Sequence, residues 1–382
     1  MNTVYFDNNA TTRVLPEVLE AMLPWFSEHF ANASSSHFLG QRAKETLISA
    51  RSAVASFLNA SPSEIIFTSG ATESNHTAIL GTLAANPTRR RIVTSTVEHS
   101  STLRLLENLA SKGFEIIKVP VNTSGELNMT ELALAVTDET VLVTLMHANN
   151  ETGVLFSIAD AVVIAHAKGA AFHTDAAQTA GKINLDVRHL GCDLLSFSGH
   201  KLHAPKGVGV LYVRKGFTLE PQIYGHQERN RRGGTENQAG IIGLSVACQQ
   251  ALEHITHHQD QIATLRDRLQ NGILGQVPLA KLNGEEARVP NTCNICFPGV
   301  SGEELLYKLD QAGIVASQGS ACTAGGTDPS HVLLAMGLNR NDAFSSIRFS
   351  LSCETTEAEV DMAVETVSTI IKVIMAAVPV AA

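Results

Sequence analysis

The chain has 382 residues, of which 44% are hydrophobic and 17% charged, and its 37 acidic and 28 basic residues give a net charge of −9. This length is enough for about two or three domains of ordinary size, and the acidic balance argues against nucleic acid or an acidic membrane as the main partner. Six cysteines at irregular positions are too few for a disulfide scaffold and indicate a reducing compartment.

The two ends of the chain show no pattern of a signal peptide or a membrane span. Residues 1–7 lack a basic stretch followed by an apolar one. The most apolar stretch, residues 367–382, contains Lys372 and Pro379 and is shorter than the ~20 residues that a bilayer requires. We therefore expect a cytoplasmic protein with a packed C-terminal helix.

Helices are predicted near 16–29 and 37–58, and these first sixty residues cannot form a domain alone. From residue 63 onward, short β-branched runs alternate with helical ones, which is typical of a parallel sheet covered by helices. The expected strands are 65–68, 91–96, 114–121, 140–147, 171–176, 194–198 and 208–213. Helices over 101–112 and 157–168 are each followed by a glycine, Gly113 and Gly169, which suits a left-handed C-cap.

A long helix is predicted over 237–274, because apolar residues recur there mostly at three- and four-residue spacing. Strands and helices then alternate over 291–297, 302–311, 314–317, 330–336, 346–351 and 356–375. The sequence therefore predicts an α/β protein with a large domain at 61–250, built on a seven-stranded, mostly parallel sheet. A smaller α+β domain is expected at 251–382, with residues 1–15 and the helices of 16–60 packed against it.

Three features follow predicted strands, at the edge where open α/β sheets bind ligands. The small-residue turn from Ser69 to Thr72 opens a helix whose free N–H groups suit a phosphate, although an ordinary N-cap would look the same. Asp175 ends another strand and would alone indicate only a turn. Lys201 follows a third, where a lysine usually reaches solvent but, if partly desolvated, becomes able to form a Schiff base.

Together these features provide the groups that bind pyridoxal phosphate, namely an anion site, a partner for the ring nitrogen and an imine-forming amine. Eight motifs extend the pattern along nearly the whole chain: residues 5–12 (YFDNNATT), 67–74 (FTSGATES), 98–99 (EH), 146–153 (MHANNETG), 175–178 (DAAQ), 198–201 (SGHK), 319–323 (GSACT) and 346–351 (SIRFSL). By these motifs the chain resembles the cysteine desulfurases, within the class V aminotransferase-like group of pyridoxal-phosphate enzymes.

The resemblance implies a homodimer with the fold-type I transferase fold, and a role for each matching residue. Lys201 would hold the cofactor, Asp175 would keep its ring nitrogen protonated so that the ring withdraws electrons, and His99 would stack on the ring and exchange protons with substrate. Arg348 would clamp the substrate carboxylate. The other cofactor-binding residues would be Ala71, Thr72, Asn150, which also lies beside the substrate, Gln178 at the ring hydroxyl, Ser198, Gly199, His200 and, from the partner subunit, Thr235.

Cys322 lies in a run of small and flexible residues, where a side chain can be exposed and mobile. The resemblance implies that its thiolate takes sulfur from L-cysteine as a persulfide, leaves L-alanine and supplies an iron–sulfur scaffold or another acceptor protein. Two alternatives are a related lyase or transaminase, such as a selenocysteine lyase, and a catalytically silent paralogue that binds partners. A transaminase has no use for a mobile thiol, and a silent paralogue need not keep Lys201, Asp175, His99 and Cys322 together.

Other groups of polar residues are expected to be structural, and no metal site is predicted. Cys293 and Cys296 have a spacing found in zinc and redox sites, but in a strand they point to opposite faces and should pack in the core. A solvated helical face is expected for His254, His257 and His258. The arginines at 229, 231 and 232 either help to bind phosphate or belong to a polar loop.

Some positions depart from the family pattern. Residues 222–229 are shorter and poorer in glycine than usual, which bears on the contact of Thr235. Ala33, Ala204 and Gln318 also replace the usual residues, although none of these changes removes a catalytic group.

Overall fold

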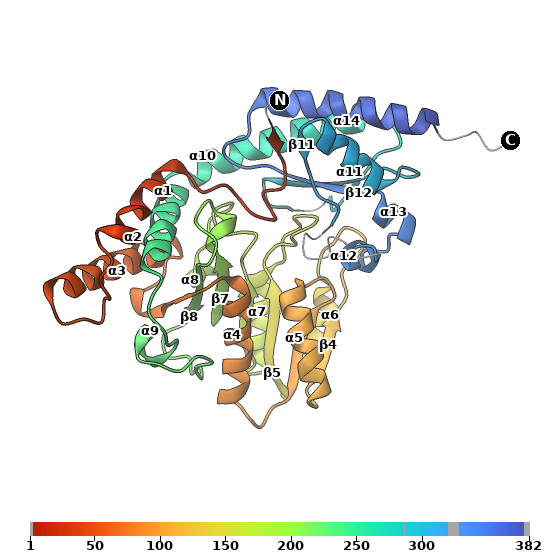
Figure 1. Cartoon of the computed structure of the whole chain (residues 1–382). Helices are drawn as coiled ribbons and strands as arrows, with labels where there is room; N and C mark the ends of the chain where they lie inside the picture. The colour runs from red at the N-terminus through yellow and green to blue at the C-terminus, as the bar shows by residue number, and fades with distance from the viewer. Residues whose placement is uncertain (1–2, 286, 320–327, 378–382) are drawn as a thin grey trace.

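The computed structural model describes residues 3–285, 287–319 and 328–377. Its main feature is a seven-stranded sheet in the lower part of Figure 1. The strands, in the order in which they lie side by side, are β2 (Ile65–Thr68), β8 (Gly209–Val213), β7 (Leu194–Ser198), β6 (Ala171–Asp175), β5 (Thr140–Met146), β3 (Arg91–Ser95) and β4 (Glu115–Val119). All neighbouring strands are parallel except β8, which runs antiparallel to both β2 and β7. The predicted mostly parallel sheet is confirmed.

Helices cover both faces of this sheet, and its central strands are therefore buried on both sides. Every residue of β5 is buried. Neighbouring residues of β3 belong to different apolar clusters, because Ile92 packs with Leu106 of one helix whereas Val93 packs in the larger core. The covering helices are α4 (Ala71–Ala85), α5 (Ser100–Ser111), α6 (Met129–Ala135), α7 (Ile158–Ala167) and α8 (Val187–Leu190).

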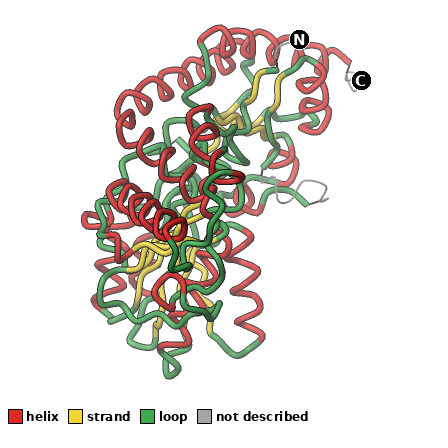
Figure 2. Tube along the Cα trace, turned by 60° about the vertical axis from the view of Figure 1, so that its left-hand side comes forward, coloured by secondary structure: helices red, strands yellow, loops and turns green. Residues whose placement is uncertain are grey.

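The C-terminal part of the chain forms a second unit with its own core (Figure 2). Its elements are a three-stranded antiparallel sheet of β9 (Lys281–Asn283), β10 (Thr292–Cys296) and β12 (Ser346–Ser350), with α11 (Gly302–Gln311) and α14 (Glu357–Ala377). The helices α12 (His331–Ala335) and α13 (Arg340–Phe344) belong to the same stretch of the chain, but their buried residues Val332, Leu333 and Ala343 lie in the apolar cluster of the large sheet. The start of the chain joins this unit, because β1 (Val4–Tyr5) pairs in parallel with β11 (Ile314–Val315). No helix within the described ranges is long and apolar enough to cross a membrane.

The N-terminal helices pack differently from the expectation. Val18 of α1 (Pro16–Met22) and Leu47 of α3 (Phe38–Phe57) lie in the same apolar cluster as the sheet residue Phe197, not in the core of the C-terminal unit. The Phe57 ring, at the end of α3, lies 5.9 Å from that of Phe197. Helices α1, α2 (Pro24–Ser27) and α3 also contact α10 (Gln238–Gln276), which connects the two units. Their apolar faces indicate burial but do not specify the partner surface.

Candidate active site

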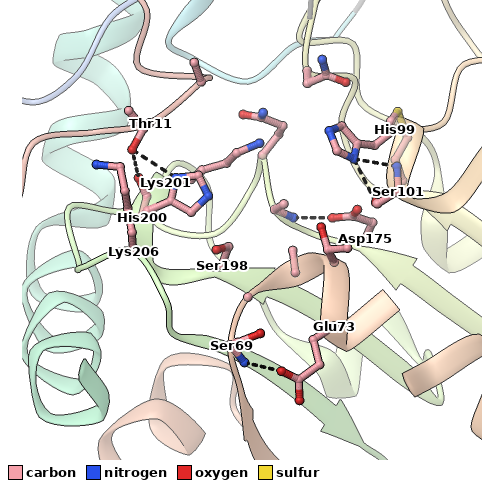
Figure 3. A pocket seen from close by; sticks show the side chains of 18 of the residues that line it. Thr11, Ser69, Glu73, His99, Ser101, Asp175, Ser198, His200, Lys201 and Lys206 are labelled. Atoms are coloured by element: carbon pink, nitrogen blue, oxygen red, sulfur yellow. Dashed lines mark hydrogen bonds between the residues drawn. The ribbon is translucent and has the colours of Figure 1, made fainter. Parts of the chain in front are cut away.

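A cavity of about 480 Å³ opens where β2, β5, β6 and β7 end, at the carboxyl edge expected for an open α/β sheet (Figure 3). A cavity of this size can hold a cofactor together with a small substrate. Most of the sequence-predicted cofactor residues line it: Ala71, Thr72, His99, Asn150, Asp175, Gln178, Ser198, His200 and Lys201. Gly199 is buried in the short turn that carries Lys201.

One end of the cavity is formed by the start of α4. No side chain caps this helix, so the positive end of its dipole faces the cavity. The turn before it is held tightly, since Ser69 N donates to Glu73 Oε2 at 2.8 Å and Arg232 Nε donates to Glu73 Oε1 at 2.8 Å. A Cβ atom at Gly209 would lie 2.5 Å from Gly70 Cα, so only glycine allows this close approach of β8. The turn and the helix start are thus fixed by side-chain and backbone contacts on both sides.

Hydroxyl and basic side chains surround the same end. Ser198, Thr11 and Lys206 line the cavity there, as Figure 3 shows. The Nδ1 atom of His200 lies 3.1 Å from Thr11 Oγ1. Burial lowers the pKa of His200 to about 4, with the charges of Lys201 and Lys206 acting in the same direction. His200 is therefore neutral near pH 7, and Lys206 supplies positive charge.

Asp175 lies at the other end and is fixed by two donors. Asn75 Nδ2, from the second turn of α4, donates to Asp175 Oδ2 at 2.7 Å, and Ala177 N donates to Oδ1 at 2.9 Å. Each carboxylate oxygen thus has its own donor, which sets the orientation of the carboxylate in the cavity wall. An acceptor held in this way suits a protonated ring nitrogen.

His99 both caps a helix and lines the cavity. Its Nδ1 atom accepts from Ser101 N at 3.2 Å at the start of α5, so its ring hydrogen lies on Nε2 when the residue is neutral. Burial lowers its pKa, and the nearby positive charge of Lys201 lowers it further. His99 is thus neutral at neutral pH, and in this tautomer its Nε2–H is a donor.

Asn150 and Arg348 meet at a third side of the site. Arg348 Nη1 donates to Asn150 O at 2.9 Å, and its Nη2 donates to Asp7 Oδ1 at 2.6 Å. Arg348 is 1% exposed, and its Nε atom is buried without a hydrogen-bond partner in the part of the chain that the structure describes. Arg348 does not line the cavity itself, whereas Asn150 does. Asn150 thus connects the cavity wall to the buried Arg348 guanidinium.

Thr235 does not line this cavity. Thr235 is exposed and lines a neighbouring pocket of about 230 Å³, which shares Ser69 and Gly207 with the main cavity. Cys322 lies outside the described residues.

The five described cysteines are not activated. Burial raises the pKa of each thiol, to about 12 for Cys192 and Cys293, to about 11 for Cys353, and above the usual value for Cys248 and Cys296. Cys293 and Cys296 are buried on β10, and the described residues contain no cluster of three or more metal-ligating side chains. These thiols are protonated at neutral pH and suit a structural role.

Sequence reasoning missed several side chains that shape the site. Asn75 orients Asp175, the pair of Glu73 and Arg232 holds the phosphate-site turn, and Lys206 lines the cavity. Lys206 lies in a Pro-Lys-Gly turn directly after the predicted Lys201 strand end, so its position was a usable signal. Asn75 and Glu73 lie within the helix that follows the small-residue turn, and their contacts become visible only in the folded chain.

The arrangement fits pyridoxal phosphate, judged on the chemistry of its donors. The open start of α4 suits the phosphate, the doubly fixed Asp175 suits the ring nitrogen, and Lys201 supplies the amine between them.

Comparisons with known proteins agree with this geometry. The family described as aminotransferase class-V matches residues 4–362. Cysteine desulfurase NifS of Azotobacter vinelandii is 48% identical over 97% of this chain and 93% of its own length, and a cysteine desulfurase of Nostoc is 45% identical over 97% and 94%. Among solved structures, a NifS-like protein has a TM-score of 0.91 at 38% identity, covering 97% of this chain and 100% of its own. A NifS-like protein from Rickettsia africae has a TM-score of 0.87 at 30% identity, with the same coverage.

Proposed function

The chain belongs to the class-V aminotransferase family and is a cysteine desulfurase, and from this premise we propose how its residues divide the reaction. The substrate is L-cysteine, the cofactor is pyridoxal phosphate, and the products are L-alanine and a persulfide on Cys322. The observation that carries the proposal is the convergence of Asp175, His99 and Lys201 on one cavity beside the uncapped start of α4.

Binding and orientation come first. The N–H groups at the start of α4, with Thr72, Ser198 and Lys206, hold the phosphate. Lys201 anchors the cofactor through its Nζ atom. Pyridoxal phosphate, when bound, withdraws into its ring the electrons released at the substrate Cα. Asp175 supports that withdrawal because its charge, fixed by Asn75, keeps a proton on the ring nitrogen.

Proton movement falls to Lys201 and His99. The Lys201 amine would take the Cα proton of the substrate and return protons to the product. His99, neutral because of its lowered pKa, exchanges a proton with the substrate on the face that it covers. Arg348 and Asn150 hold the substrate carboxylate, which aligns the Cα–H bond for removal.

Sulfur transfer is assigned to Cys322. Its thiolate attacks the substrate Sγ, so that a sulfur–sulfur bond forms and the Cβ–Sγ bond breaks. The electron pair of the broken bond stays with the carbon, which takes up a proton and leaves as alanine. The five other cysteines are poor candidates, because burial raises the pKa of every one of them.

The proposed assembly is a homodimer in which Thr235 contacts the phosphate in the partner's cavity. Exposed Thr235 lies outside the main cavity of its own chain, which agrees with such a role. Helices α1 to α3 and the segment before Thr235 also expose large apolar side chains, among them Leu23, Phe26, Phe30, Phe38 and Tyr224. A patch of this kind is typical of a protein interface. The sulfur acceptor is proposed to be an iron–sulfur scaffold protein in the cytoplasm.

Incubation with L-cysteine tests the function directly. The purified protein loaded with pyridoxal phosphate should show a visible absorption band that borohydride traps on Lys201, and with a thiol reductant it should release alanine and sulfide in equal amounts. A protein that stays colourless with added cofactor, or that consumes cysteine without forming alanine, contradicts the proposal.

A further inference from the structure

Lys182 is a buried amine that pairs with no acidic side chain in the described part of the chain. It lies four residues after Gln178 and is 8% exposed. Among the described residues, no carboxylate forms an ion pair with it. Burial lowers the pKa of Lys182 well below its usual range, and the positive charges of Lys201 and Arg348 act in the same direction. Burying an apolar side chain of similar size would cost less free energy than burying this amine. The role of Lys182 therefore lies in its hydrogen bonds.

The Nζ atom of Lys182 connects two amide side chains. It donates to Gln178 Oε1 at 2.8 Å and to Asn9 Oδ1 at 2.7 Å. Asn9 is a junction between the two units of the chain, because its Nδ2 donates to Asn150 O and to Thr292 Oγ1. The Asn9 amide is therefore fixed from both sides, and Lys182 holds it on the side that faces Gln178.

These contacts determine which atom of the Gln178 amide faces which neighbour. Lys182 Nζ donates to the oxygen of Gln178, and the backbone carbonyl of Asn9, which can only accept, takes Gln178 Nε2 at 3.1 Å. The amide nitrogen carries two hydrogens, and the second is the one that can serve a ligand in the cavity that Gln178 lines. Gln178 is thus set to donate, and not to accept, toward that ligand.

We infer that Lys182 is a positioning residue that acts through Gln178: it turns the Gln178 N–H group toward the ring hydroxyl of pyridoxal phosphate and so stabilises that hydroxyl in its deprotonated form. The inference rests on the proposed cofactor and extends the site to a residue outside the main cavity. A donor directed at a negatively charged oxygen lowers the pKa of that group, and loss of the donor raises it.

Several charged or titratable groups lie near Lys182, so Lys182 could also affect the cofactor by direct electrostatics. Lys182 shares a small cavity of about 80 Å³ with the titratable side chains of Lys201, His203, His258 and Cys353. The charge of Arg348, which is paired with Asp7, also acts on Lys182. A direct electrostatic effect of Lys182 on Lys201 would also change the titration of the bound cofactor. Only an effect that passes through Gln178 disappears when Gln178 is removed.

The experiment is a pH titration of the visible band of the holoenzyme. Lys182→Met keeps the length of the side chain and removes its donor, and we expect the titration midpoint to rise by about one to two pH units. Asn291→Ala is the matched control, because Asn291 Nδ2 also donates to Asn9 Oδ1, at 3.0 Å, but does not contact Gln178. Its midpoint should stay within a few tenths of a unit of the unmodified enzyme.

The effect of Lys182→Met is then measured in the Gln178→Ala variant. If Lys182 acts through Gln178, adding Lys182→Met to Gln178→Ala produces no further shift. An equal shift in both backgrounds, or no shift in Lys182→Met alone, contradicts the inference while leaving the proposed function intact. Absence of a borohydride-sensitive band in the unmodified protein contradicts both.

Discussion

The two ends of the cavity are built in different ways. At the start of α4, the expected anion meets several donors at once, from the helix N-terminus, Ser198 and Lys206. At the other end, Asp175 and His99 each act alone, and each is fixed by its own neighbours, Asn75 for the former and Ser101 for the latter. At the anion end, several donors bind the same expected group, so loss of one leaves the others in place. At the other end, each function depends on a single side chain. The loss of activity on substitution should therefore be larger at the Asp175 end of the cavity than at the anion end.

The largest effect is expected for Lys201→Ala, since Lys201 is proposed both to anchor the cofactor and to carry protons. Alanine release should fall by about 10³-fold or more. Borohydride should no longer attach the cofactor to the chain. The exposed Lys215 serves as control, and Lys215→Ala should keep full turnover. Substantial turnover in Lys201→Ala would remove Lys201 from the mechanism.

Asp175→Asn should come next, with a loss of about 10²-fold or more in kcat. The amide keeps the size of the carboxylate but loses the charge that holds a proton on the ring nitrogen. The bound cofactor should also change its absorption spectrum. Asp160→Asn on the exposed side of α7 controls for loss of charge elsewhere in the protein. If Asp175→Asn keeps more than half of the activity, the two ends do not differ as argued.

A smaller effect is expected for Asn75→Ala, which leaves Asp175 with the Ala177 N donor alone. A hydrogen bond to a charged group contributes about 1.5–3 kcal/mol, so kcat should fall by about tenfold or somewhat more. Steady-state kinetics with saturating cofactor measure this. A loss as large as that of Asp175→Asn would mean that Asn75 contacts the cofactor itself.

Lys206→Ala tests the shared end of the cavity. Because the helix N-terminus and Ser198 remain, the affinity for pyridoxal phosphate should fall by only about three- to tenfold. The kcat at saturating cofactor should stay nearly unchanged. Equilibrium titration of the apoprotein followed by turnover assays separates the two quantities. A loss of kcat comparable to that of Asn75→Ala would contradict the division of roles.

The smallest effect is expected from mild acid. The proposed proton exchange at His99 starts from its neutral form, and burial together with the charge of Lys201 lowers its pKa below the ordinary value of 6.5. Protonation of His99 therefore sets in only as the pH falls below that value. Its contribution to the loss of kcat between pH 7.5 and pH 6.5 should be less than about twofold. A pH profile of kcat for the unmodified enzyme and for His99→Gln isolates this contribution.

Much of the fold could be predicted because the strands of the parallel sheet are short, apolar and bounded by clear stops. The α11 range was predicted to the residue, and α5 and α7 are followed by Gly113 and Gly169 in the left-handed conformation, as expected. The pairing of β1 was missed, since two residues give no pattern and their partner, β11, lies some 310 residues along the chain. The antiparallel direction of β8 and the surface against which α3 packs are likewise absent from local sequence patterns.

The candidate site also contains some residues that local sequence predicts and others that it does not. Asp175 and Lys201 could be found because each directly follows a buried strand, and such positions meet at one edge of the sheet. Asn75 and Lys182 could not, since their roles consist of contacts to Asp175 and to Gln178 that form only in the folded chain. Arg348 was found by its motif, but its burial behind Asn150 was not foreseeable.

The central claim is that sulfur passes from L-cysteine to Cys322. The most direct measurement is a single turnover of the holoenzyme with L-cysteine and no reductant, followed by mass analysis of peptides and by quantification of alanine. The account predicts that one sulfur atom is added to the peptide containing Cys322 for each alanine released, and that Cys322→Ala forms neither product. Alanine formation with the added sulfur on another cysteine, or full turnover of Cys322→Ala, would contradict it.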